Sequence, residues 1–118
     1  MGVFTNKKYN DSNWKVSVTL YSNVTSILPW MFSRVRMDIV EIPESVKSIG
    51  NNAFEDCKIL ETVKLFRQEP PSLGSNAFTG CESLACISVP SGTLDAYKSA
   101  TDWQQMLNFD GKDLFQDW

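Results

Sequence analysis

A ten-residue pattern occurs twice in this sequence, and the two copies begin 24 positions apart. Residues 48–57 read SIGNNAFEDC and residues 72–81 read SLGSNAFTGC, so both follow S-[IL]-G-x-N-A-F-x-x-C. Each copy continues into a tail of the form L-x-x-[VI]-x-[LV], at residues 60–65 and 84–89. A period of this length is typical of solenoid proteins, in which each repeat forms one coil and stacks on the next.

A third and more degenerate copy lies upstream of these two. Its apolar positions align with those of the copy that follows: Val24, Ile27, Phe32, Met37, Val40 and Ile42 match Val46, Ile49, Phe54, Leu60, Val63 and Leu65. Val18 and Leu20 then resemble the tail of a fourth unit that lacks its first half. The tails recur at Val18, Val40, Val63 and Ile87, with spacings of 22, 23 and 24 residues. We therefore expect three to four coils.

Stacking should place equivalent side chains of successive coils directly above one another, so that rows of apolar residues form the core. The predicted rows are Phe32, Phe54 and Phe78; Ile27, Ile49 and Leu73; Val18, Val40, Val63 and Ile87; and Leu20, Ile42, Leu65 and Val89. Ala53 and Ala77 precede two of the phenylalanines and leave room for a tightly curled backbone. Burial of each phenylalanine should contribute about 1.5–3 kcal/mol.

The repeat resembles the BspA-type leucine-rich repeats of bacterial surface proteins, whose consensus is similar to x-I-G-x-x-A-F-x-x-C-x-x-L-x-x-I-x-L-P. The copies at 49–65 and 73–90 match it closely, whereas the copy at 27–43 has Leu28, Met31 and Val35 in place of Gly, Ala and Cys. The resemblance covers residues 14–108. It implies a strand-rich α/β leucine-rich-repeat solenoid, a right-handed superhelix of short parallel strands and turns with short C-terminal helices.

The sequence divides into three parts. Residues 1–13 show no repeat and are expected to be a linker or a partial cap, residues 14–90 hold the repeats, and residues 91–118 resemble the family's C-terminal cap. Solenoids need such caps because a terminal coil otherwise exposes a strand edge and an apolar face. Within the last part, residues 109–118 either fold back as a final strand or lie loose.

Two short helices are predicted in the cap. Thr93 is a plausible N-cap for the first helix, in which Leu94, Tyr97 and Ala100 have helical spacing. Thr101 is followed three residues later by Gln104, which is the pattern of a capping box. We expect this box to open a second helix with Trp103 and Leu107 facing inward.

The sequence gives little evidence for a catalytic or metal-binding site. The chain has no histidine, and its three cysteines have neither the CxxC spacing of a zinc site nor the even number of a disulfide framework. Cys57 and Cys81 occupy the same repeat position and are expected to be buried structural thiols. Cys86 takes the place of Thr62 and should be partly exposed, so a reactive thiol is the alternative there. We predict no enzyme, no cofactor and no metal.

The charge and hydropathy of the chain limit which classes of partner it can bind and where it can be located. A net charge of -3 and a pI near 4.8 argue against nucleic acid and anionic membranes, which both need a basic face. No apolar stretch is long enough to cross a bilayer, and the first residues lack a signal-peptide core. The chain is either cytosolic or a mature fragment. Because the array starts within a repeat, we favour the fragment, and the family resemblance implies a secreted or cell-surface protein whose leader is missing.

Side chains between the buried positions of the strand tails should point outward and form a candidate binding face. This face comprises Ser17, Thr19, Glu41, Glu61, Thr62, Lys64, Ala85, Cys86 and Ser88, with Tyr21 and Phe66 at its rim. An ordinary solvated surface is the alternative.

Proteins of the resembled family are mostly secreted or cell-surface molecules associated with adhesion to host matrix proteins and other cells. The resemblance therefore implies an adhesin-like module for a host or bacterial surface protein or glycan. A structural stalk or capping segment is the other reading, and the oligomeric state is open.

Overall fold

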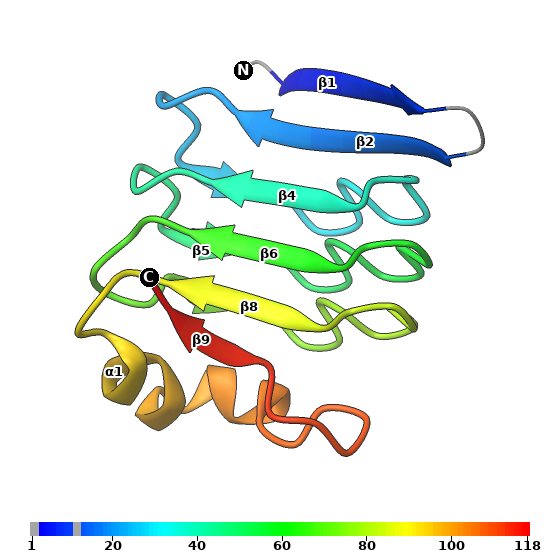
Figure 1. The fold of residues 1–118 in the computed structure, drawn as a ribbon. Helices are drawn as coiled ribbons and strands as arrows, with labels where there is room; N and C mark the ends of the chain where they lie inside the picture. The colour runs from blue at the N-terminus through cyan, green and yellow to red at the C-terminus, as the bar shows by residue number, and fades with distance from the viewer. Residues whose placement is uncertain (1–2, 11–12) are drawn as a thin grey trace.

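The computed structural model describes residues 3–10 and 13–118 as two sheets and two short helices (Figure 1). The large sheet has the strand order β1-β2-β4-β6-β8-β9. Its strands are β1 (Val3–Asn10), β2 (Asn13–Leu20), β4 (Ile39–Ile42), β6 (Thr62–Leu65), β8 (Cys86–Val89) and β9 (Phe115–Asp117). The small sheet has the order β3-β5-β7, with β3 (Ser26–Ile27), β5 (Ser48–Ile49) and β7 (Ser72–Leu73). The helices are α1 (Leu94–Ser99) and the 3-10 helix η1 (Asp102–Met106).

Three coils follow one another along the stack, and each contributes one strand to each sheet. Coil 1 spans residues 26–42, coil 2 spans 48–65 and coil 3 spans 72–89. Their strands pair in parallel, so that Val40 lies opposite Val63 and Val63 lies opposite Ile87. In the small sheet Ile49 pairs with both Ile27 and Leu73. The predicted leucine-rich-repeat solenoid of short parallel strands is confirmed.

The phenylalanine row forms the centre of the core. The ring of Phe54 is fully buried and lies between those of Phe32 and Phe78, with centroid distances of 5.4 and 5.1 Å. Its plane is nearly parallel to both, at 13° and 2°. The four predicted rows are buried throughout. The spacing of two dozen residues in the sequence thus corresponds to direct stacking in space.

Two repeat glycines are required because successive coils approach closely at their backbones. A Cβ atom on Gly50 would lie 2.4 Å from the backbone nitrogen of Pro29, and one on Gly74 would lie 2.4 Å from that of Asn51. Both contacts are with the preceding coil. Leu28 holds the same position in coil 1 and is 55% exposed. The departure of coil 1 from the repeat pattern therefore follows from its place at the start of the stack.

Substitution of Gly50 by alanine should destabilise the protein by about 3 kcal/mol, because backbone atoms of coil 1 would have to move apart from coil 2. Gly92→Ala is the matched control: nothing lies within 4 Å of the added Cβ, and only its φ of +86° opposes the change. This control should cost about 1 kcal/mol. Urea unfolding of both variants measures the difference, and equal stabilities would contradict the close-approach explanation.

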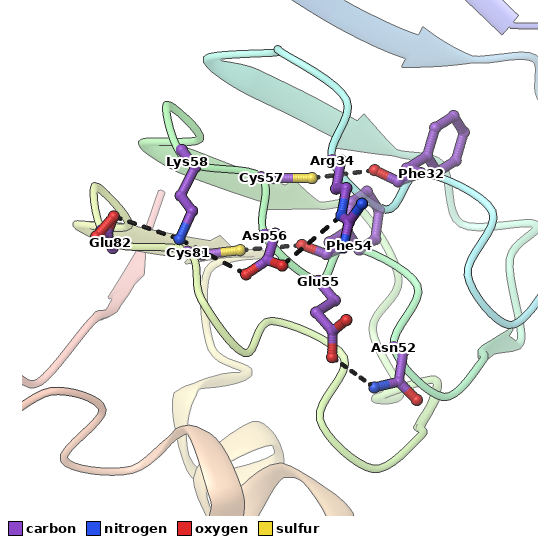
Figure 2. A network of polar contacts seen from close by, with 10 residues as sticks. All are labelled: Phe32, Arg34, Asn52, Phe54, Glu55, Asp56, Cys57, Lys58, Cys81 and Glu82. Carbon is purple, nitrogen blue, oxygen red and sulfur yellow. Dashed lines mark hydrogen bonds and ion pairs between the residues drawn. The ribbon is translucent and has the colours of Figure 1, made fainter.

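The repeat cysteines also connect successive coils. The Sγ of Cys57 donates a hydrogen bond to the carbonyl of Phe32, and the Sγ of Cys81 donates one to the carbonyl of Phe54, both at 3.1 Å (Figure 2). Both thiols are buried, as predicted. The neighbouring Cys57 thiol, followed by burial, raises the pKa of Cys81 far above its ordinary value. These residues are small buried donors that satisfy a carbonyl of the coil before, and Val35 stands at their position in coil 1.

At the N-terminal end, β1 pairs antiparallel with β2 from Val3 opposite Leu20 to Asn10 opposite Asn13. The two strands form a long hairpin at one end of the large sheet, visible in blue in Figure 1. A strand in this position pairs with the edge that β2 would otherwise expose. The segment 3–10, which showed no repeat in the sequence, therefore occupies the place of a cap.

At the C-terminal end, the chain supplies the pairing that a fourth coil would have made. Strand β9 adds in parallel to β8, with Ile87 opposite Phe115, so the last residues form a final strand. The β7 edge of the small sheet is covered by η1, where the Asp102 carboxylate accepts the N–H of Leu73 at 2.7 Å. The indole N–H of Trp103 donates to the carbonyl of Pro71, also at 2.7 Å. Side chains of the cap thus satisfy backbone groups of coil 3.

The predicted capping box at the second helix is wrong. The Nε2 of Gln104 donates to the carbonyl of Lys98 at 2.9 Å, and Thr101 makes no side-chain cap. The segment is a 3-10 helix, in which residues three apart lie in line. Trp103 and Met106 are therefore the buried pair, whereas Leu107, which was expected to face inward, is only half-buried.

The first cap helix also begins differently from the prediction. Thr93 holds the N-cap position of α1, but its Oγ1 donates to the carbonyl of Pro90 at 2.7 Å instead of capping the helix. Tyr97 is the buried residue of this helix, and its hydroxyl donates to the carbonyl of Arg67 at 2.8 Å. The helix is thus anchored by Tyr97 to the loop after β6.

Candidate functional site on the outer sheet face

Outward-pointing side chains form rows across the large sheet. Alternation in each strand buries one set of side chains and leaves the other on a surface that we call the outer face. One row runs through Thr19, Glu41, Lys64, Ser88 and Gln116 by direct strand register. A second row runs through Ser17, Ile39, Thr62 and Cys86. The predicted positions Thr19, Glu41, Thr62, Lys64 and Ser88 therefore share one surface.

Polar contacts order part of the first row. The Oγ1 of Thr19 donates to Oε1 of Glu41 at 2.7 Å. Lys64 lies directly across from Glu41 in the parallel register, so opposite charges are neighbours. The hydrogen bond orders the side chains of Thr19 and Glu41 on the outer face.

An aromatic cluster stands at the carboxyl ends of β6 and β9, and it consists of Lys64, Phe66 and Trp118. The rings of Phe66 and Trp118 meet edge to face, with centroids 5.3 Å apart. The Nζ of Lys64 lies 5.2 Å from the Phe66 centroid and 4.9 Å from that of Trp118. Each such cation contact contributes roughly 0.5–1 kcal/mol at an exposed site. Trp118 is still 50% exposed.

Backbone hydrogen bonds hold this cluster in place. The N–H of Phe66 donates to the carbonyl of Ile42, and that of Trp118 donates to the carbonyl of Val89. Sequence reasoning found Lys64 and Phe66 but not Trp118. Its position depends on the pairing of β9 with β8, for which the repeat pattern gives no signal because β9 lies outside the repeats.

Two predicted residues lie at the margins of the outer face. Tyr21 follows β2 and is 52% exposed, but β4 separates it from Phe66 in the strand order. Glu61 precedes β6 and is exposed, and its carbonyl accepts the N–H groups of Ala85 and Cys86. Glu61 therefore lies at the amino end of the strands, opposite the end that carries the aromatic cluster.

The third cysteine is placed on the outer face, in the row of Thr62. It is half-buried, and this burial raises the pKa of the Cys86 thiol. An activated nucleophile needs the opposite shift, because the thiolate is the reactive form.

In the described part of the chain, no group of three or more histidine, cysteine or carboxylate side chains could hold a metal ion. No helix among these residues is long and apolar enough to cross a membrane.

A second polar region lies on the turns that precede the strands of the large sheet. In Figure 2, Asp56 sits between the side chains of Arg34 and Lys58, and Lys58 also reaches Glu82. Arg34, Asp56 and Gly80 hold the same place in successive coils, with φ of 65°, 58° and 81°. Gly and Asp tolerate this left-handed conformation, whereas for most side chains it costs roughly 1–2 kcal/mol.

The other left-handed position of the repeat shows the same departure in coil 1. Trp30 has a φ of 63°, where coils 2 and 3 use Asn52 and Asn76. Sequence reasoning passed over Trp30 and Arg34. The available signal was a large side chain at a turn position where the other two copies have Asn, Asp or Gly.

Parallel coils, a continuous phenylalanine row and caps at the ends define the class of protein: a leucine-rich-repeat solenoid that exposes an ordered sheet face. Comparison with protein families identifies which leucine-rich-repeat family the chain belongs to. The chain belongs to the family of the BspA-type leucine-rich repeat region, which matches residues 4–107 in six copies. This match begins ten residues before the expected limit at Trp14 and so includes β1. A search of curated proteins found no significant match.

Proposed function

We propose that this protein is a cell-surface or secreted binding module, without catalytic activity, that recognises a protein or glycan through its outer face. The observation that carries the proposal is the aromatic cluster of Lys64, Phe66 and Trp118. It combines an exposed ring, that of Trp118, and a half-buried ring, that of Phe66, with a positive charge at one end of an ordered polar sheet. Membership in the BspA-type family supports the surface location and the adhesin-like role.

The physical argument rests on how binding energy is distributed in interfaces. A few aromatic and cationic residues commonly contribute most of it, and the surrounding polar contacts mainly exclude water. In the cluster the rings contact each other and the Lys64 ammonium, so little side-chain freedom is left to lose when a partner binds. Beneath the cluster, β6 is paired on both sides, with β4 and β8, and β9 is paired with β8 at the end of the sheet.

The triple variant Lys64→Gln, Phe66→Ala and Trp118→Ala should lose capture of its partner while retaining the fold. Binding would be measured on an array of immobilised host matrix proteins and surface glycans. We expect a loss of about 100-fold in affinity for the captured species, since two hot-spot side chains are removed. Thermal melting should fall by about 10 °C at most, because these side chains lie outside the core.

A matched control uses the opposite end of the same face. Glu61→Gln with Thr62→Ala changes polar side chains at the amino end of β6 and leaves the rings intact. This control should lose no more than about threefold in affinity, because polar residues around a hot spot contribute little of the binding energy. Binding by the triple variant that is as strong as that of this control would refute the role of the cluster, and an unaltered protein that captures nothing from the array would favour a structural stalk.

A further inference from the structure

A pocket of about 400 Å³ opens between the turns of coils 1 and 2, lined by Arg34, Arg36, Asp56 and Lys58. Arg34 and Arg36 precede β4, and Asp56 and Lys58 precede β6. The pocket is therefore at the amino end of the strands, whereas the aromatic cluster is at their carboxyl end. It is a second surface feature, independent of the function proposed above.

The lining of this pocket is positively charged although the chain as a whole is acidic, with a net charge of -3. Three cationic side chains surround one carboxylate. Asp56 contacts Arg34 through Nε at 3.9 Å and Lys58 through Nζ at 3.6 Å. The terminal amino groups of Arg34 are thus left for another partner, and its side chain is 81% exposed.

The other two cations differ in how far they are already engaged. Lys58 also contacts Glu82 of coil 3, at 3.5 Å, so its charge is partly balanced. Arg36 makes no hydrogen bond or ion pair with any residue that the structure describes. The two arginines therefore provide the unbalanced charge of the pocket, and Asp56 orients the guanidinium of Arg34 beside it.

Arg34 is held in this place against its backbone preference. Its φ of 65° is one that Asp56 and Gly80 accept more readily at the same repeat position. Backbone stability alone would favour Asp, Asn or Gly here. What Arg34 adds is a second guanidinium next to Arg36, and departures of this kind commonly mark functional sites.

We propose that this pocket binds a sulfate group carried on a sulfated polysaccharide. Guanidinium groups present forked donors that match the oxygens of tetrahedral anions, and a sulfate ester offers three terminal oxygens to three cationic side chains. A volume of about 400 Å³ exceeds an inorganic ion and falls in the range of pockets for small organic ligands. It has room for the sugar ring that carries the sulfate.

Calorimetric titration with a heparin-derived hexasaccharide tests the proposal. The variant Arg34→Gly with Arg36→Gln should bind about tenfold more weakly or worse, with a shallower dependence on salt. Its thermal stability should be unchanged or raised, because glycine accepts the left-handed backbone. This separates loss of binding from loss of folding.

The control variant Lys47→Gln with Lys112→Gln removes the same charge from two exposed lysines outside the pocket and should bind like the unaltered protein. Four outcomes would overturn the proposal. They are unchanged binding by the double arginine variant, equal binding of a desulfated hexasaccharide, equal binding of a polyglutamate peptide, and inorganic sulfate that binds as tightly as the sugar. The last would indicate a free-anion site only.

Discussion

Phe54→Ala should unfold this protein under conditions in which the unaltered chain is stable. The side chain is fully buried and contacts a phenylalanine ring on each side. Removing it takes away the apolar transfer energy and leaves a cavity, which together cost about 3–5 kcal/mol. The two ring contacts add roughly 0.5–1.5 kcal/mol each. This loss is a large share of the 5–15 kcal/mol that is typical of a whole domain.

Comparison with two other phenylalanines makes the test specific to the row. Phe78 stacks on Phe54 on one side, so Phe78→Ala should cost less by about one ring contact. Phe66 lies on the outer face and is half-buried, and Phe66→Ala should cost at most about 1–2 kcal/mol. Denaturant unfolding of the three variants gives the order. If Phe54→Ala were no worse than Phe66→Ala, the row would not be the centre of the core.

The repeated part of the fold could be predicted because each coil repeats the same interactions. Phe32, Phe54 and Phe78 have the same neighbours one coil away, so a shared spacing in sequence becomes a shared row in space. Even the departures at Leu28 and Val35 have a structural cause. Gly50 and Cys57 contact the coil before them, and the position of coil 1 at the start of the stack removes that requirement.

The ends of the molecule could not be predicted in the same way, because they replace repeat contacts with unique ones. Nothing in the period indicates that residues 3–10 pair antiparallel with β2. At the other end, the Asp102 carboxylate and the Trp103 indole take over hydrogen bonds that another coil would have made. The local pattern at Thr101 and Gln104 predicted a capping box, but the segment forms a 3-10 turn that buries Trp103 and Met106 instead.

The candidate sites show the same division. The strand rows that carry Thr19, Glu41 and Lys64 follow from alternation and register alone. The aromatic cluster also needs Trp118, which reaches Phe66 only through the pairing of β9 with β8. The basic pocket needs the left-handed turn at Arg34, which brings its side chain beside Asp56 of the next coil. Both sites combine a repeat position with a contact that no repeat specifies.

Trp103→Ala should detach the C-terminal cap and destabilise the whole stack. Trp103 is fully buried, and its ring contacts those of Tyr97 and Phe115 at 5.3 and 6.3 Å. The packing loss is about 3–5 kcal/mol. The carbonyl of Pro71 also loses its 2.7 Å hydrogen bond, at a further cost of roughly 1–3 kcal/mol if it stays buried. The total should approach that of Phe54→Ala.

Two companion variants divide this effect into its parts. Trp103→Phe keeps most of the ring but removes the indole N–H, so it should show mainly the hydrogen-bond cost of about 1–3 kcal/mol. Trp118→Ala removes a half-exposed indole from the outer face and should have little effect on stability. Amide hydrogen exchange shows which part of the structure is destabilised. The N–H of Leu73 is protected by its hydrogen bond to Asp102, which lies in the same helical turn as Trp103. That amide should exchange faster in Trp103→Ala than amides in coil 1, and uniform exchange would show that the cap and the stack unfold as one unit.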